Sequence, residues 1–256
     1  MSFEDKIAHE FRVNNPNVSL YQIVSQETGS LTRKQVDTIS NAIKLSQSLE
    51  SISLSDCKNI ANTDINTIIT ALHGSHKLTE LYLNNLKINK EAAESLVVVI
   101  NKCPLEKLSI ANINCKVADF IKVIEPLKTN KTIESLILGN ITIKSMNALS
   151  EALFHNITIT DLQYNLSNIS HNTPNNYVDI ASNIAGAIDR NIKIKEEKDI
   201  ERKLKQDILQ QSDIEEQQRL EFKKFVECCD DMNVDPNTIV FDSRVLPLVS
   251  ECGLHH

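Results

Sequence analysis

The chain of 256 residues has 41% hydrophobic and 24% charged residues and a formal net charge of −7, a composition typical of a globular protein and not of a disordered one. It has no long basic run, which argues against binding to nucleic acid or to an anionic membrane surface. No apolar run reaches 18 residues and the N-terminus lacks a positive-then-apolar pattern, so we expect a cytoplasmic protein with no membrane insertion and no cleavable signal peptide.

The first 47 residues are predicted to form an N-terminal capping region. "NVSLYQIV" (17–24) has the composition of an edge strand, and "LTRKQVDTISNAIKLSQ" (31–47) has apolar residues at the spacing of an amphipathic helix. Irregular first and last units are typical of repeat proteins, whose exposed ends need covering. We therefore expect 1–47 to be a strand and helix that begin a larger repeat structure.

Residues 48–191 contain one eleven-residue phrase five times, with apolar residues at its first, fourth and sixth positions and, in every copy but the first, at its eleventh. The copies start 26 to 29 residues apart, at Leu49, Leu78, Leu105, Ile133 and Ile159. Within a copy, alternating residues such as Leu81 and Leu83 predict a short strand, and later apolar residues three or four apart predict an amphipathic helix. Thr63 and Asn89 stand where two of these helices should be N-capped.

A single strand–helix unit cannot bury its own apolar face, so the units are expected to stack. The expected fold class is α/β: a right-handed solenoid with parallel strands on the concave face and helices on the convex face. The spacing over about 45–190 resembles that of leucine-rich repeat proteins, and the unit length with its full helix is similar to their ribonuclease-inhibitor-like subclass.

The phrase departs from the family pattern at its ninth position, where the family usually has Asn or Cys. Only Cys57 fits, and the other four copies have Leu86, Ile113, Ile141 and Ser167. Asparagine stands one place earlier, at Asn85, Asn112 and Asn140. We therefore expect the turn after each strand to differ in detail from the family turn.

Residues 192–256 are predicted to form a C-terminal helical cap, because the repeat pattern stops and charged residues become dense after Lys195. A stripe of apolar residues four apart indicates one helix, at Ile200, Leu204 and Ile208. Ser212 and Glu215 have the spacing of a capping box that would open a second helix and give a hairpin. A short closing helix is expected within 235–254.

This predicted cap has two interpretations. It could shield the open end of the solenoid, or it could be a helical module that binds a partner. Exposure of Phe222 and Phe225 would favour the second interpretation, since aromatic side chains concentrate binding energy at interfaces.

The sequence contains no recognisable catalytic or cofactor motif. Phosphate-binding loops, HExxH and CxxC are missing, and His73 and His76 have no obvious further ligands, so we expect no enzyme activity, no cofactor and no metal. The cysteines within the repeats stand at core positions and are expected to be reduced and unreactive. Asn-X-Ser/Thr sequons, including those of Asn130 and Asn156, are interpreted as accidental in a chain without a secretion signal.

The outward strand positions should form columns once the repeats stack. One column is expected to read Ser51, Glu80, Lys107, Ser135 and Asp161, and the next Ser53, Tyr82, Ser109, Ile137 and Gln163. The column at the strand exits is expected to read Asp56, Asn85, Asn112, Asn140 and Leu166, with the asparagines bonding to the turn backbone.

A scaffold that is copied while its outward residues vary suits recognition of a macromolecule by a broad surface. Tyr82 and Ile137 are the bulky members of an otherwise small and polar face, so they are the expected anchors. The predicted partner-binding residues on the concave face are Glu80, Tyr82, Asn84, Lys107, Ser109, Ser135, Ile137, Asp161 and Gln163.

The main functional hypothesis is a non-catalytic module that docks another protein on its concave face. The Ile-, Asn- and Lys-rich sequence is similar to leucine-rich repeat effectors that intracellular bacteria inject into host cells. The resemblance to ribonuclease inhibitor implies that the partner is an enzyme, which the chain would mask or regulate. That partner would be a host protein or another effector. One alternative is a cytoskeletal adaptor, because actin-capping tropomodulins have a similar short solenoid with a helical end; an exposed apolar stripe on the C-terminal helices would favour it. The other alternative is an enzyme with a site in those helices.

Overall fold

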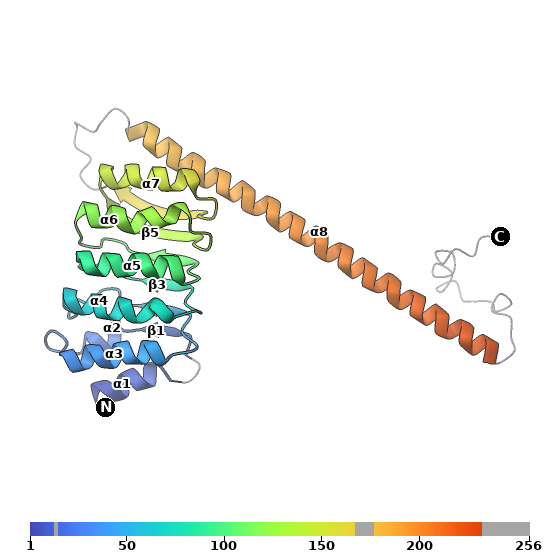
Figure 1. The fold of residues 1–256 in the computed structure, drawn as a ribbon, viewed down its shortest axis with the longest axis horizontal. Helices are drawn as coiled ribbons and strands as arrows, with labels where there is room; N and C mark the ends of the chain where they lie inside the picture. The colour runs from blue at the N-terminus through green and yellow to red at the C-terminus, as the bar shows by residue number, and fades with distance from the viewer. Residues whose placement is uncertain (13–14, 167–176, 232–256) are drawn as a thin grey trace. The chain divides into compact units, whose positions relative to one another are not determined.

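The computed structural model describes residues 1–12, 15–166 and 177–231, and its six strands form one parallel sheet in sequence order (Figure 1). The strands are β1 (Asn17–Ser19), β2 (Ser51–Ser53), β3 (Glu80–Tyr82), β4 (Lys107–Ser109), β5 (Ser135–Ile141) and β6 (Asp161–Leu166). The helices are α1 (Phe3–Glu10), α2 (Tyr21–Val24), α3 (Arg33–Leu45), α4 (Asn62–Ala71), α5 (Lys90–Lys102), α6 (Val117–Ile124), α7 (Ile143–His155) and α8 (Tyr177–Asp231), with 3-10 turns η1 (Leu72–Gly74) and η2 (Glu125–Lys128).

Strands and helices alternate along the chain, and Figure 1 shows α3 to α7 stacked in order on one side of the sheet. This confirms the predicted α/β solenoid. The chain divides into two compact units, Met1–Lys195 and Glu196–His256, and α8 contributes to both. The first unit holds the whole sheet.

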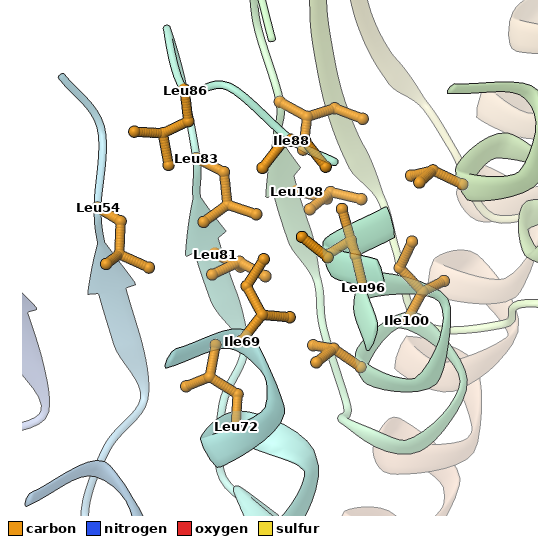
Figure 2. Packing of buried hydrophobic residues seen from close by; sticks show 14 of the residues in the cluster. Leu54, Ile69, Leu72, Leu81, Leu83, Leu86, Ile88, Leu96, Ile100 and Leu108 are labelled. Atoms are coloured by element: carbon orange, nitrogen blue, oxygen red, sulfur yellow. The ribbon is translucent and has the colours of Figure 1, made fainter. Parts of the chain in front are cut away.

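The core of the first unit lies between the sheet and the helices. The repeated apolar positions of the phrase supply it, and in the second copy they are all buried: Leu78, Leu81, Leu83, Leu86 and Ile88. Figure 2 shows side chains of this copy packed with Leu96 and Ile100 of α5 and with Ile69 of α4. The phrase repeats because each copy must bury the same face against the next copy.

The N-terminal region continues the sheet, since β1 pairs in parallel with β2. Its helix was predicted correctly within a few residues: α3 begins after Thr32, whose hydroxyl and the Gln35 side chain cap each other's backbone. The predicted strand at 17–24 is only partly confirmed, because it ends at Ser19 and the following residues form the helical turn α2.

Of the two predicted N-caps, one is confirmed and one is wrong. The side chain of Asn89 accepts a hydrogen bond from the backbone nitrogen of Ala92, 2.9 Å away, at the start of α5. Helix α4 instead begins at Asn62 after Ala61, which leaves Thr63 inside its first turn. An extended Ala61 can begin the helix without a side-chain cap, because the buried face of α4 supplies the stabilisation.

The turns after β2, β3 and β4 each contain a residue with left-handed backbone. Its φ is 63° at Asp56, 60° at Asn85 and 55° at Asn112, the eighth position of each phrase. Asn and Asp tolerate this conformation better than other residues with a side chain. Asparagine stands one place before the family position because the eighth residue of the phrase has a left-handed backbone.

In the fourth copy of the phrase a different position has the left-handed backbone, and the predicted strand-exit column is wrong there. Here the left-handed residue is Gly139, because the register between β5 and β6 shifts at this point. Asn140 therefore pairs with Asn165, and Ile141 pairs with Leu166. The predicted strand-exit column is wrong in its last step, since a one-residue bulge is not visible in a repeat pattern.

The first turns of α8 pack against the last repeat. Ile180, Ile184 and Ala187 are buried, and the guanidinium of Arg190 donates to the carbonyl oxygens of Leu153 and Phe154 at the end of α7. The next residue, Asn191, is also buried and donates to the carbonyl oxygen of Ile159, 2.9 Å away. These contacts supply hydrogen-bond donors to carbonyl oxygens of the last repeat and cover its apolar residues.

Helix α8 runs without interruption for 55 residues, so the predicted hairpin is wrong. Its sequence has no proline, and Ser212 and Glu215 lie inside a segment that is already helical, where a cap is not needed. Ion pairs one turn apart, such as Lys205 with Glu201 at 2.6 Å, support the helix beyond the solenoid. None of the described helices is apolar enough over sufficient length to cross a membrane, and the helix expected within 235–254 lies outside the described residues.

Candidate functional site

The register of the sheet brings the predicted site residues into two columns on the concave face. Cα pairing between neighbouring strands aligns Ser51, Glu80, Lys107, Ser135 and Asp161 in the first column, and Ser53, Tyr82, Ser109, Ile137 and Gln163 in the second. Both predicted columns are therefore confirmed as geometry. Adjacent members lie about 4.8 Å apart along the sheet, so five strands present a face about 19 Å wide. Binding of a partner by this face stays a prediction.

Tyr82 is held in place by its neighbours in the two columns. Its hydroxyl donates to the carboxylate of Glu80 at 2.9 Å, and the hydroxyl of Ser51 donates to the same oxygen at 3.2 Å. The ammonium of Lys107 lies 5.5 Å from the centre of the ring, within the range of a cation–π contact. Burial, and then the hydrogen bond to Glu80, raise the pKa of Tyr82, so the phenol stays protonated and remains a donor. We call these four residues the tyrosine cluster.

Two of the predicted site residues, Ser109 and Asn84, form hydrogen bonds within the scaffold. Ser109 is only 1% exposed, and its hydroxyl donates to the side-chain oxygen of Asn84 at 2.7 Å. The same oxygen of Asn84 accepts the backbone nitrogen of Ala111 at 2.8 Å. Ser109 lies in register between Tyr82 and Ile137. The predicted role of Ser109 in direct partner contact is therefore corrected.

The far end of the concave face is polar. Ile137 is half-buried on β5, and the hydroxyl of Ser135 donates to the carboxylate of Asp161 at 2.7 Å. Asp161 and Gln163 are exposed on β6. An apolar side chain with polar groups around it is thus available next to the tyrosine cluster.

One ion pair beside this face was missed from the sequence. Lys195 donates to the carboxylate of Glu134 at 2.6 Å, across 61 positions of the chain. Glu134 directly precedes Ser135, so the pair lies next to the first column. No local pattern signals a contact over this separation, and only the fold brings the two residues together.

The cysteines within the repeats are poor nucleophiles. Burial raises the pKa of Cys57 to about 12, with a smaller contribution from Asp56, and raises the pKa of Cys103 and of Cys115 to about 11 each. These thiols are therefore protonated at neutral pH, and the thiolate is the reactive form. In the part of the chain that the structure describes, His, Cys, Asp and Glu side chains form no group of three or more that could hold a metal ion.

The solved structures that resemble this chain identify its fold. It is similar to a structure described as Leiomodin-1 Actin-Binding Site 2, with a TM-score of 0.54 and 13% identity over 70% of this chain and 99% of that chain. It is also similar to the tropomodulin C-terminal domain of Caenorhabditis elegans, with a TM-score of 0.52 and 15% identity over 64% of this chain and 98% of that chain. No protein-family model and no curated protein matches the sequence. The fold is thus of the leucine-rich-repeat type, as predicted.

Proposed function

We propose that this chain is a protein-binding module that docks its partner on the concave face. The observation that supports this proposal is the tyrosine cluster beside Ile137. Tyr82 and Ile137 occupy the same column two strands apart, and the buried Ser109 between them leaves no polar group exposed at that position. Ordered aromatic and aliphatic anchors with a charged rim are typical of the centre of a protein interface.

Actin is the partner that we favour, so the cytoskeletal alternative takes precedence over the bacterial effector. One of the similar folds is described as an actin-binding site, and neither is described as an effector or an enzyme inhibitor. The feature expected of an adaptor is also present, because α8 exposes apolar side chains at Ile200, Leu204 and Ile208. An actin partner requires a cytoplasmic location, which stays a prediction.

The double variant Tyr82→Ala/Ile137→Ala tests the concave face. We expect the full-length chain to sediment with actin filaments and the variant to bind about 10-fold more weakly or worse, because it loses both anchors. The melting temperature should remain close to that of the parent chain, since neither side chain belongs to the buried core.

Phe154→Ala is the matched control. This aromatic side chain is 72% exposed on α7, on the helix side of the sheet, so its removal should leave actin binding unchanged. A parent chain that does not bind actin would contradict the proposed partner. If the parent chain binds actin and the double variant binds it with the same affinity, the concave site is contradicted.

A further inference from the structure

One side of α8 after Lys195 has large side chains at intervals of three or four residues. We call this set the apolar stripe: Ile200, Leu204, Ile208, Gln211, Ile214, Gln218, Phe222 and Phe225. Such intervals place residues on one side of an α-helix. Ile200, Leu204 and Ile208 are 67%, 59% and 60% exposed, and the rings of Phe222 and Phe225 lie 6.4 Å apart. Most helical stability in proteins comes from packing of such a side.

We propose that the apolar stripe binds the apolar stripe of a second copy of this chain in antiparallel orientation. The intervals of the stripe are nearly symmetrical about its middle, between Ser212 and Asp213. Antiparallel pairing about this point places Ile200 opposite Phe225 and Gln211 opposite Ile214, and it brings Leu204 and Ile208 within one residue of Phe222 and Gln218. Every layer then has a large apolar side chain, and no glutamine faces another. A parallel pair in register would place each glutamine against its own copy.

The charges beside the apolar stripe also match in this orientation. Three flanking pairs have opposite charges, and each would occur twice: Asp199 with Lys224, Glu201 with Lys223, and Lys203 with Glu221. Two pairs that lie equally close to exact opposition have like charges, Lys205 with Arg219 and Lys203 with Lys224. The ammonium of Lys205 is already 2.6 Å from the carboxylate of Glu201, which offsets part of this repulsion. Flanking charges of this kind select the orientation of paired helices.

The area of the apolar stripe is sufficient for a stable pair. From Ile200 to Phe225 the helix is about 38 Å long at its usual rise per residue. Gln218, Phe222 and Phe225 are already half-buried, and the other five side chains are exposed. If the exposed side chains lose about 90 Å² of accessible surface each and the half-buried ones about 50 Å² each, two stripes bury about 1,200 Å². Specific protein interfaces bury about 1,200–2,000 Å² in total. The occupant that best fits the stripe in spacing, charge and area is thus the same segment of another copy.

Sedimentation equilibrium of the full-length chain tests the proposal. Between about 5 and 100 µM protein we expect a mass twice the 28.8 kDa of one chain. The variant Leu204→Glu/Phe222→Glu should have the mass of a single chain, because it places four carboxylates within the paired stripes. The matched control is Leu209→Glu/Leu220→Glu, which changes two side chains that are 66% and 51% exposed on the opposite side of α8. This control should remain dimeric.

A charge reversal tests the orientation. Lys203→Glu should weaken the dimer about 10-fold, and adding Glu221→Lys should restore its affinity to within about twofold, because the two positions face each other only in the antiparallel pair. Failure of the second substitution to restore the dimer would overturn this orientation. A monomeric parent chain at about 100 µM would overturn the proposal as a whole. One further result would overturn it: a parent chain that is monomeric, with actin binding lost in the Leu204→Glu/Phe222→Glu variant and kept in its control. Actin, and not a second copy, would then occupy the apolar stripe.

Discussion

Leu83 and Leu138 hold the sixth position of their phrases and are almost completely buried between the sheet and the helices. Replacement of either residue by alanine should lower the free energy of unfolding by about 2–5 kcal/mol, because it removes buried methyl groups and leaves a cavity. Urea unfolding followed by circular dichroism measures the change. Leu45→Ala, at a leucine that is 81% exposed, should change the stability by less than about 0.5 kcal/mol. Equal effects at the buried and exposed leucines would show that the phrase does not form the core.

Gly139 is required where β5 is bulged, at the register shift between β5 and β6. Its φ is 64°, and a Cβ atom there would lie 2.6 Å from the side-chain oxygen of Asn112 and 2.7 Å from its backbone nitrogen. We expect Gly139→Ala to lower the free energy of unfolding by about 1–3 kcal/mol, through backbone strain and this overlap. Gly186→Ala is the matched control, because a Cβ on this helical glycine meets no atom within 4 Å.

The control should change stability in the opposite direction. Alanine is favoured over glycine inside a helix by about 1 kcal/mol, so Gly186→Ala should raise the melting temperature while Gly139→Ala lowers it. Differential scanning calorimetry of the two variants distinguishes these effects. A Gly139→Ala variant as stable as the parent chain would mean that the bulge can adopt another conformation at no cost.

At the scale of elements, the half-buried Asn130 and the buried Asn156 connect the loops between helices and strands. Asn130 donates to the carbonyl oxygen of Ile100 in the preceding repeat at 3.0 Å. Asn156 donates to the carbonyl oxygen of Leu127 at 2.8 Å. Each side-chain oxygen also accepts backbone nitrogens just before the next strand. Both residues belong to sequons, and their amides are occupied by the fold, which agrees with the interpretation of these sequons as accidental.

Asn156→Ala should destabilise the solenoid by about 2–4 kcal/mol. The side chain is 1% exposed, and its loss would leave buried carbonyl and amide groups without partners. Chemical denaturation measures the effect. Asn165→Ala, at an exposed asparagine on β6, should be close to neutral. A neutral Asn156→Ala variant would mean that water replaces the lost hydrogen bonds.

The elements were predictable where local periodicity determines them. Period-two and helical spacings within 48–166 gave the strands, the helices and both site columns, because every repeat buries the same positions. The errors have other causes. Thr63 was misplaced because packing, not capping, starts α4, and the hairpin at Ser212 was inferred from a capping pattern that also occurs inside continuous helices. The burial of Ser109 and the ion pair of Lys195 depend on neighbours that only the folded chain provides.

At the scale of the whole molecule, the two compact units have different kinds of side-chain environment. Every buried hydrophobic residue within the described part of the chain lies at or before Ala187, in the first unit. In the second unit, α8 exposes large apolar residues such as Leu204 and Leu220. Because the solenoid has its own core, it can keep its surface sites when the second unit is removed. The self-association proposed for α8 requires the second unit.

Removal of residues 196–256 separates these two properties in one experiment. The shortened chain retains the core, the tyrosine cluster and the ion pair between Lys195 and Glu134, so its melting temperature and its affinity for the concave-face partner should stay close to those of the full chain. Its mass by sedimentation should be that of one chain, because the apolar stripe is gone. Retained binding by this monomer would also speak against an enzyme site in the C-terminal helices. Loss of partner binding together with an unchanged melt would instead place the binding surface on α8 and contradict the concave site.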